Sequence, residues 1–210
     1  MFMLHRFFEV TNMKYLIQSP ARTVLLSILL TSILGGVFPL ALTPAVAAER
    51  AVTVEKNPPG DIPDSQVFVK YQSPLGFSVQ VPEGWSRTDH TSGVNFSDKF
   101  NKIDISVEPM TAPPSVASAT RQQAAELIKR GRAVKMTSIK DVDLPIGPVI
   151  VMDYESNSEP NQITNKQLRL ESNRYLFFRN GKLATLDLSA PKGADNMDQW
   201  RLISQSFRWN

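Results

Sequence analysis

Two histidines and no cysteine limit the chemistry open to this 210-residue chain. His90 follows Asp89, and Asp98 lies eight residues further on, so these side chains could hold a divalent cation or respond to pH. Their spacing and number are poor for a metal site, and a solvated histidine in a polar loop is the simpler interpretation. Asp98, Asp104 and Glu108 offer carboxylates for calcium or manganese, although no EF-hand-like loop surrounds them.

The sequence lacks the common catalytic motifs. Without cysteine there are no disulfides, thiolate metal sites or cysteine nucleophiles. There is no G-x-S-x-G elbow, phosphate-binding loop, dinucleotide fingerprint or H-E-x-x-H motif. A pair of carboxylates for glycoside chemistry stays open, because separation in space defines such a pair. We therefore expect a protein that is not an enzyme, with a hydrolase that uses paired carboxylates as the less favoured alternative.

A basic cluster spans the predicted end of a helix: Lys129, Arg130, Arg132 and Lys135. Cations there complement the negative end of the helix dipole, which is a sufficient structural reason for them. The functional alternative is docking to an acidic partner or to an anionic membrane surface. Three further basic residues along one predicted strand could extend this surface: Arg169, Arg174 and Arg179.

The N-terminus has the features of a targeting segment. An apolar, uncharged run over residues 23–42 follows basic residues, and the small residues Ala45-Val46-Ala47-Ala48 precede Glu49. Together these features predict a secretory signal peptide over residues 1–48, cleaved after Ala47 or Ala48. An uncleaved membrane anchor is the alternative, but glycine and proline interrupt the apolar run.

Cleavage would change the charge of the chain. The whole sequence has 23 Lys and Arg against 20 Asp and Glu, a net charge of +3. Residues 1–48 hold three of the basic residues and one acid, so the other 162 residues carry a net charge of +1. A nearly neutral exported domain has no global electrostatic affinity for nucleic acid. The length suits a single domain.

The rest of the chain predicts a flexible, exposed, proline-rich arm over residues 49–66 and one α+β domain over residues 67–210. Six strands are predicted from apolar patterning: 67–71, 77–81, 103–107, 149–154, 167–178 and 183–188. Strict alternation in the second and third of them is typical of an antiparallel sheet with one covered face. Because strands and helices do not alternate along the chain, a doubly wound parallel sheet is disfavoured.

Asn180-Gly181 separates two strand-like segments and predicts a hairpin with a type I′ turn. In the first of these strands Leu168 and Leu170 have even numbers, whereas Tyr175 and Phe177 have odd ones. One inserted residue turns all later side chains to the other face of a sheet. We therefore expect a β-bulge near residues 172–173.

Two helices are predicted to flank the sheet. Ser118 can cap a helix over residues 119–130, which Gly131 can end. A second helix follows Asp195. Its apolar residues form one stripe: Met197, Trp200, Ile203 and Phe207.

The order of several short motifs resembles the PsbP family, the exported extrinsic proteins of photosystem II and their bacterial relatives. The opening element is Gly76-Phe77 followed by Pro82-Glu83-Gly84-Trp85. Residues 94–98, the Asn-Gly hairpin with its following Lys182-Leu183, and the helix that contains Trp200 continue the match. Each piece is short, and their order and spacing over residues 67–209 carry the resemblance.

This resemblance implies an αβα sandwich around a central antiparallel sheet, and a non-enzymatic accessory role beside photosynthetic complexes. It also implies calcium or manganese as the divalent cation to consider. We therefore expect an exported monomer in the thylakoid lumen or periplasm, peripherally attached to a membrane protein complex such as photosystem II. The alternative is a periplasmic or extracellular ligand-binding or envelope protein of a non-photosynthetic bacterium with the same fold.

Overall fold

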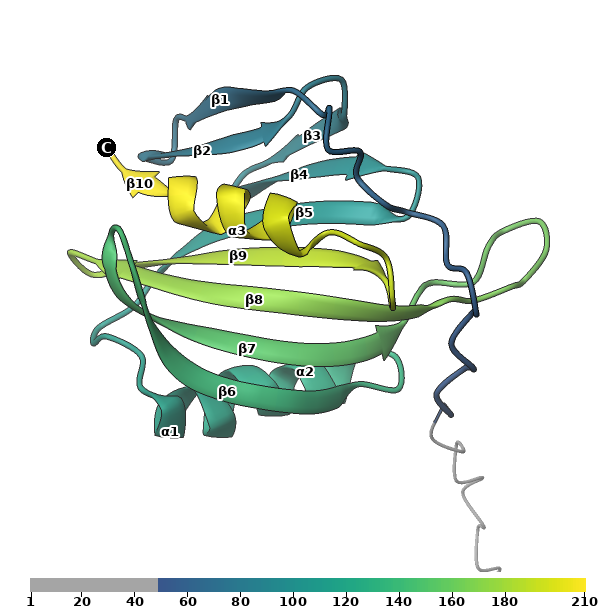
Figure 1. The fold of residues 1–210 in the computed structure, drawn as a ribbon. Helices are drawn as coiled ribbons and strands as arrows, with labels where there is room; N and C mark the ends of the chain where they lie inside the picture. Colours follow the sequence, from purple (N-terminus) through teal and green to yellow (C-terminus); the bar gives the residue numbers. More distant parts are fainter. Residues whose placement is uncertain (1–48) are drawn as a thin grey trace, which may run out of the picture. The chain divides into compact units, whose positions relative to one another are not determined.

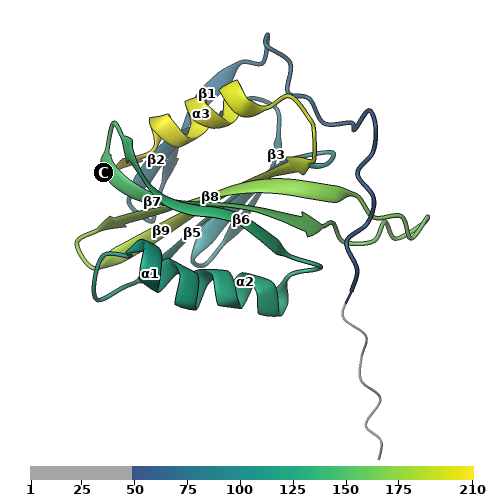
Figure 2. The ribbon, with the colours of Figure 1, turned by 60° about the horizontal axis from the view of Figure 1, so that its bottom comes forward.

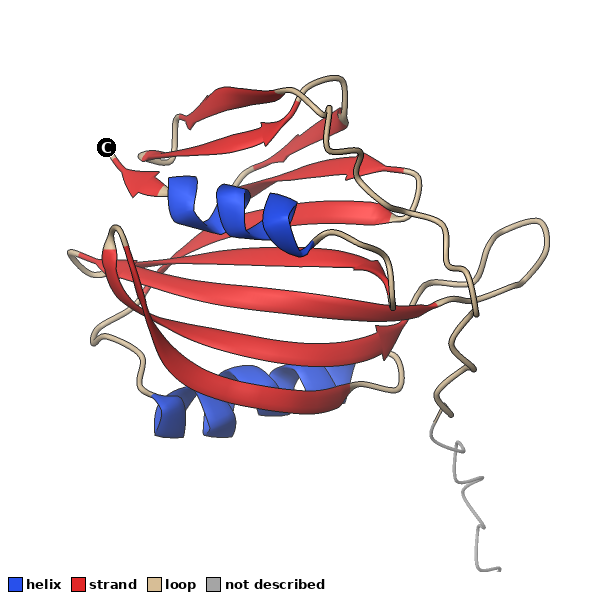
Figure 3. Cartoon of the chain, in the orientation of Figure 1, coloured by secondary structure: helices blue, strands red, loops and turns tan. Residues whose placement is uncertain are grey.

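The computed structural model describes residues 49–210, and the predicted signal peptide lies outside them. The strands pair antiparallel in two sheets, of order β1-β2-β10 and β3-β4-β5-β9-β8-β7-β6 (Figure 1, Figure 3). The strands are β1 (Phe68–Ser73), β2 (Phe77–Pro82), β3 (Ser86–His90), β4 (Gly93–Asp98), β5 (Asn101–Pro109), β6 (Lys135–Leu144), β7 (Gly147–Asn157), β8 (Arg169–Arg179), β9 (Lys182–Pro191) and β10 (Arg208–Trp209). The helical segments are α1 (Val116–Ala119), the π-helical turn η1 (Thr120–Ala124), α2 (Ala125–Arg130) and α3 (Met197–Ser206).

The large sheet has a helical segment on each face (Figure 2). We call the two sides the α3 face and the α1 face. The α3 face carries apolar side chains from its central strands, such as Ile105, Phe177 and Leu186, which pack against α3 and the small sheet. The α1 face carries a smaller apolar cluster in which Met152 and Leu176 pack beneath the segment α1–η1–α2. The α+β class predicted from the sequence is confirmed.

Stacked aromatic rings join the two sheets to α3. The ring of Phe207, just after α3, lies 4.1 Å from that of Phe177 on β8 and 5.5 Å from that of Phe77 on β2, measured between centroids. All three side chains are fully buried. Because Phe207 contacts both sheets, burial of this one residue ties the C-terminal helix to the small sheet as well as to the large one.

Local predictions hold at the hairpin and shift at the first helix. Asn180 and Gly181 have φ angles of 49° and 74°, so the type I′ turn is confirmed. The helical segment begins three residues earlier than predicted, because Ser115 is its cap. The backbone amide of Ser118 donates to the Ser115 hydroxyl at 3.2 Å, and the amide of Ser115 donates to the Ser118 hydroxyl at 2.9 Å. In the second helix, Met197 of the predicted apolar stripe is exposed.

The predicted β-bulge in β8 is wrong. This strand pairs with both neighbours without a shift of register from Leu170 onward. Its apolar parity changes because helices cover its two faces: Tyr175 and Phe177 face α3, whereas Leu176 faces α1–η1–α2. Leu170 lies on the α1 face, beyond the helical segment. A register shift does occur in β6, between Met136 and Ser138.

The proline-rich segment before β1 is not free in the structure. Ile62 is 4% exposed, and its backbone amide donates to the side-chain oxygen of Asn196 at 2.7 Å. Gln199 on α3 donates to the carbonyl of Ile62 at 3.1 Å. These contacts attach the end of the segment to the start of α3, although most of residues 49–66 are exposed, as predicted. None of the helices in residues 49–210 has the length and apolar character needed to cross a membrane.

Candidate functional site

A polar hollow of about 360 Å³ lies on the α1 face. The helical segment covers Met152 and Leu176, whereas further along the same strands Tyr154 and Ser172 line the hollow. Asp187 on β9 also lines it. The turn between β4 and β5, and the loop of residues 158–168 between β7 and β8, complete the walls. Most of the residues that line this uncovered part of the α1 face are therefore polar, although Leu170 also belongs to it.

A network of three side chains on adjacent strands forms the floor. Arg174 Nε donates to Asp187 Oδ2 at 2.9 Å, and the Tyr154 hydroxyl donates to the same carboxylate at 2.8 and 3.0 Å. The Arg174 guanidinium also lies 5.8 Å from the centre of the Tyr154 ring. Asp187 Oδ2 thus accepts from both Arg174 and Tyr154, whereas Oδ1 accepts from Tyr154 alone.

Electrostatics fix the charge state of this network. Burial, and secondly the charge of Asp187, raise the pKa of Tyr154, so the hydroxyl keeps its proton. Burial alone would lower the pKa of Arg174, but the charge of Asp187 outweighs it and the pKa is raised. Arg174 therefore keeps its charge, and the hydrogen bonds from Arg174 and Tyr154 hold Asp187 in place as an acceptor.

Asp104 adds a second carboxylate to the hollow. It lies on β5 directly opposite Asp187, and the two residues are partners in the β5–β9 ladder. Partial burial, and secondly the charge of Asp187, raise the pKa of Asp104, although the residue stays open to solvent. Like charges directly opposite each other destabilise a sheet. Asp104 is therefore an exposed carboxylate that a cation or a hydrogen-bond donor would complement.

The hollow does bring two carboxylates together, which is the arrangement that the hydrolase alternative requires. Both oxygens of Asp187 accept from Tyr154, and Arg174 neutralises its charge. That carboxylate is thus engaged as an acceptor and is poorly placed to act as a nucleophile or base. The arrangement is suited to binding a small polar group.

The three residues weighed for a metal site, Asp89, His90 and Asp98, do not lie together, and His90 is exposed, in line with the simpler interpretation of a solvated histidine. His90 pairs with Gly93 at one end of the β3–β4 hairpin, and Asp98 lies at the other end. Asp89 points to the opposite face of β3 and pairs with Arg87 at 3.0 Å. In the described part of the chain, no three His, Asp or Glu side chains are arranged to hold a metal ion.

The other carboxylates named as calcium or manganese ligands are also dispersed. Asp104 and Glu108 are four residues apart on β5, about 13 Å along an extended strand. Asp98 is exposed at the end of the preceding strand. Only Asp104 of these residues lines the hollow.

The predicted docking cluster is only partly free. Lys129 and Lys135 are exposed, on α2 and at the start of β6. Arg130 pairs with Glu126 one turn earlier on the helix. Arg132 lies between two acids, Glu49 at 3.1 Å and Glu159 at 3.4 Å. Two of the four cations are therefore already paired with acidic side chains of the same chain.

The arginines of β8 do not extend that cluster. Arg169 is 4% exposed and pairs with Glu155 at 3.3 Å, while Arg174 belongs to the floor of the hollow. Arg179 is exposed at the far end of the strand, beside the hairpin turn. The three residues have separate surroundings and form no common surface.

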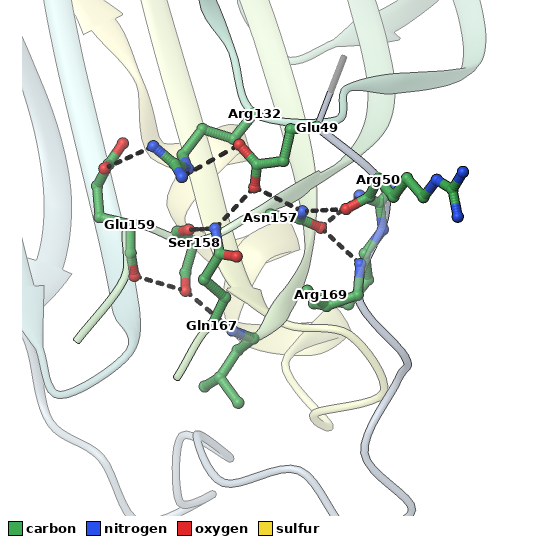
Figure 4. Close-up of polar contacts among 10 residues, drawn as sticks. Glu49, Arg50, Arg132, Asn157, Ser158, Glu159, Gln167 and Arg169 are labelled. Atoms are coloured by element: carbon green, nitrogen blue, oxygen red, sulfur yellow. Dashed lines mark hydrogen bonds and ion pairs between the residues drawn. The ribbon is translucent and has the colours of Figure 1, made fainter. Parts of the chain in front are cut away.

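A polar site that no sequence pattern marks holds the first described residues of the chain (Figure 4). We call it the N-terminal seat, and define it as Arg132, Asn157, Lys166, Gln167 and Arg169. Its side chains contact Glu49, Arg50, Val52 and Glu55. The seat comes from two loops and the ends of two strands, so no local motif marks it.

The comparisons with known proteins concern the fold. The chain is similar to cyanobacterial PsbP (CyanoP) from Synechocystis sp. PCC 6803, with a TM-score of 0.50 and 15% identity over 72% of this chain and 98% of that one. A Bacteroides thetaiotaomicron structure gives a TM-score of 0.44 and 17% identity over 67% of this chain and 48% of that one. A protein of unknown function from Pseudomonas aeruginosa gives a TM-score of 0.42 and 12% identity over 66% of this chain and 94% of that one. No protein-family model and no curated protein sequence matches. The fold is PsbP-like.

Proposed function

We propose that this chain is an exported accessory protein, without catalytic activity, that docks on a membrane protein complex. Photosystem II is the complex that the family resemblance favours, approached from the lumenal side. The observation that carries the proposal is the likeness of fold to cyanobacterial PsbP, which extends over 98% of that protein. The predicted signal peptide supplies the route to such a compartment.

Docking is attributed to the exposed surface. Lys129 and Lys135 are the two members of the predicted basic cluster that are exposed and lack the acidic partners of the other two. Exposed cations of this kind steer association with an acidic partner, and salt weakens that attraction. The attachment is therefore peripheral and sensitive to ionic strength.

Co-purification from membranes of the source organism tests this proposal. An affinity-tagged chain is expected to bring down subunits of a membrane complex from detergent extracts at low salt, and fewer of them at high salt. A double variant, Lys129→Glu with Lys135→Glu, is expected to bring down less. The matched control is Lys70→Glu, an exposed position on β1 outside the cluster. A chain that stays wholly in the soluble fraction at low salt would refute docking.

A second candidate function is the binding of a small polar ligand in the hollow. The observation that favours it is the pair Asp104 and Asp187, of which only Asp187 has Arg174 as a counter-ion. A ligand with an ammonium or amide group would complement Asp104. Screening by thermal shift against small amines and amides, with Asp104→Asn as the control, separates this candidate from docking.

A further inference from the structure

The N-terminal seat is built from buried polar groups. Arg169 is 4% exposed and donates to the carbonyl of Ala133 at 2.8 Å and to Asn157 Oδ1 at 3.0 Å. Asn157 is also 4% exposed. Since Arg169 and its partner Glu155 hold the Asn157 amide in one orientation, the seat has a fixed shape.

Asn157 contacts the backbone of the bound segment as a neighbouring strand would. Its Oδ1 accepts from the amide of Val52 at 3.1 Å, and its Nδ2 donates to the carbonyl of Arg50 at 2.8 Å. These two contacts require an extended peptide but no particular side chain at either position. The Arg50 side chain itself points away from the seat (Figure 4).

Specificity comes from two acidic side chains of the segment. Glu49 Oε1 accepts from Asn157 at 2.8 Å and from Gln167 at 2.7 Å, and Glu49 Oε2 pairs with Arg132 at 3.1 Å. These hydrogen bonds, more than the charge of Arg132, lower the pKa of Glu49. Six residues later Glu55 pairs with Lys166. The seat thus complements two carboxylates on one segment of the chain, Glu49 and Glu55.

The segment it holds is attached mainly by these polar contacts. Most of residues 49–57 are exposed, so little apolar burial fixes them to the domain. A tether nevertheless keeps such a segment at an effective concentration in the millimolar range, which favours it over free competitors. A partner that supplies a similar peptide, and further contacts elsewhere, could displace it.

We propose that the N-terminal seat is a recognition site for an extended acidic peptide, filled in this structure by residues 49–55, and that an acidic segment of the docking partner takes its place. The proposal rests on the proposed docking function. It adds that the part of the partner that binds in the N-terminal seat is an acidic peptide segment. Arg132, predicted as a docking cation, is available to a partner only when Glu49 leaves it.

A peptide with the sequence of residues 49–55 tests the site directly. Its binding to residues 49–210, a range that lies within one compact unit, is measured by fluorescence anisotropy. Glu49→Gln weakens the chain's own segment, and the variant is expected to bind the peptide about fivefold more tightly than the unaltered chain, as suits an exposed ion pair. Glu171→Gln, on the same strand as Arg169 but outside the seat, is expected to behave like the unaltered chain.

Two further comparisons make the outcome decisive. Adding Gln167→Ala or Asn157→Ala to Glu49→Gln is expected to abolish the fivefold gain in peptide affinity. Because Asn157 also accepts from the buried Arg169, its loss can disturb folding, and the Gln167 variant gives the same test without that risk. A peptide with glutamine at both acidic positions is expected to bind at least fivefold more weakly. The proposal would be overturned if the acidic and glutamine peptides bound equally well. It would also be overturned if the unaltered chain and the Glu49→Gln variant bound the acidic peptide equally well. Membrane co-purification that persists despite that result would leave the docking function standing.

Discussion

The two faces of the large sheet are built from the same strands but have different surroundings. On β9, Leu186 and Leu188 point to the α3 face and are fully buried, while Asp187 between them points into the hollow. On β5, Ile103 and Ile105 flank Asp104 in the same way. One face is a closed apolar core, and the other is apolar mainly beneath its helical segment.

This difference assigns separate tasks to the two faces. The α3 face derives its stability from apolar area and ring stacking, which carry no titrating charge and are not weakened by the screening of charges by salt. On the uncovered α1 face, hydrogen bonds and an ion pair among Arg174, Asp187 and Tyr154 hold the polar groups in place. The opposed carboxylates of Asp104 and Asp187 repel each other and destabilise this face. Substitutions on the first face should thus change stability most, and those on the second should change charge and binding.

The largest effect is expected from Phe207→Ala on the α3 face. Removing this ring empties the space between Phe77 and Phe177, and the free energy of unfolding should fall by about 4 kcal/mol. Urea denaturation followed by circular dichroism measures it. Leu202→Ala, at a 40% exposed position on the preceding helix α3, is the control and should cost less than about 1 kcal/mol. Similar losses for the two variants would contradict the central role of the ring stack.

On the α1 face, Asp187→Asn is expected to lower the free energy of unfolding by about 2 kcal/mol, because Arg174 then lacks its counter-ion. The control is Asp198→Asn, which removes an exposed pair with Arg201 and should change stability by less than about 0.5 kcal/mol. Denaturation of both variants in the same buffer gives the comparison. A neutral result for Asp187→Asn would show that the network does not stabilise the floor.

Tyr154→Phe tests the same floor more gently. The substitution removes a hydroxyl that donates to Asp187 but leaves the ring and the Arg174 pair in place. We expect a loss of about 1 kcal/mol in the same denaturation assay. A loss as large as that of Asp187→Asn would mean that the hydroxyl, and not the ion pair, organises the floor.

The smallest effect, and one of opposite sign, is expected from Asp104→Asn. Because the folded state raises the pKa of this carboxyl above its ordinary value of 3.8, its charge disfavours the folded state at neutral pH. The variant should thus be slightly more stable at pH 7, by less than about 0.5 kcal/mol for so open a group. The gain should shrink as the pH falls through the raised pKa towards 3.8, where the unaltered carboxyl takes up its proton. A gain that does not depend on pH would exclude the carboxyl as its cause.

The elements that local patterning marks were predictable. Alternation located β2 and β5, and Asn180-Gly181 located the β8–β9 turn, because these signals depend on neighbouring residues only. The wrongly predicted bulge in β8 depends on distant residues instead. The apolar pattern of a strand follows which of its positions are covered, and two helical segments distant in sequence cover different faces of β8.

The candidate sites were predictable only in part. Asp104 was singled out as a carboxylate, but its partner Asp187 lies 83 positions further along the chain and meets it through the β5–β9 ladder. His90 and Asp98 are close in sequence, yet they lie at opposite ends of a hairpin. The seat joins Glu49 to Asn157 across 108 positions. Sequence proximity was a poor guide in each case.

By itself, the sequence determined the class of fold, the absence of thiol chemistry and the residue types from which any site must be built. Periodicity and turn chemistry act over a few residues, so they can be read without knowing the fold. Only the tertiary structure decided which carboxylates face each other, which cations of the basic cluster are already paired, and where residues 49–55 lie. Those outcomes depend on strand order and on the covering of each sheet face, and contacts between distant segments establish both.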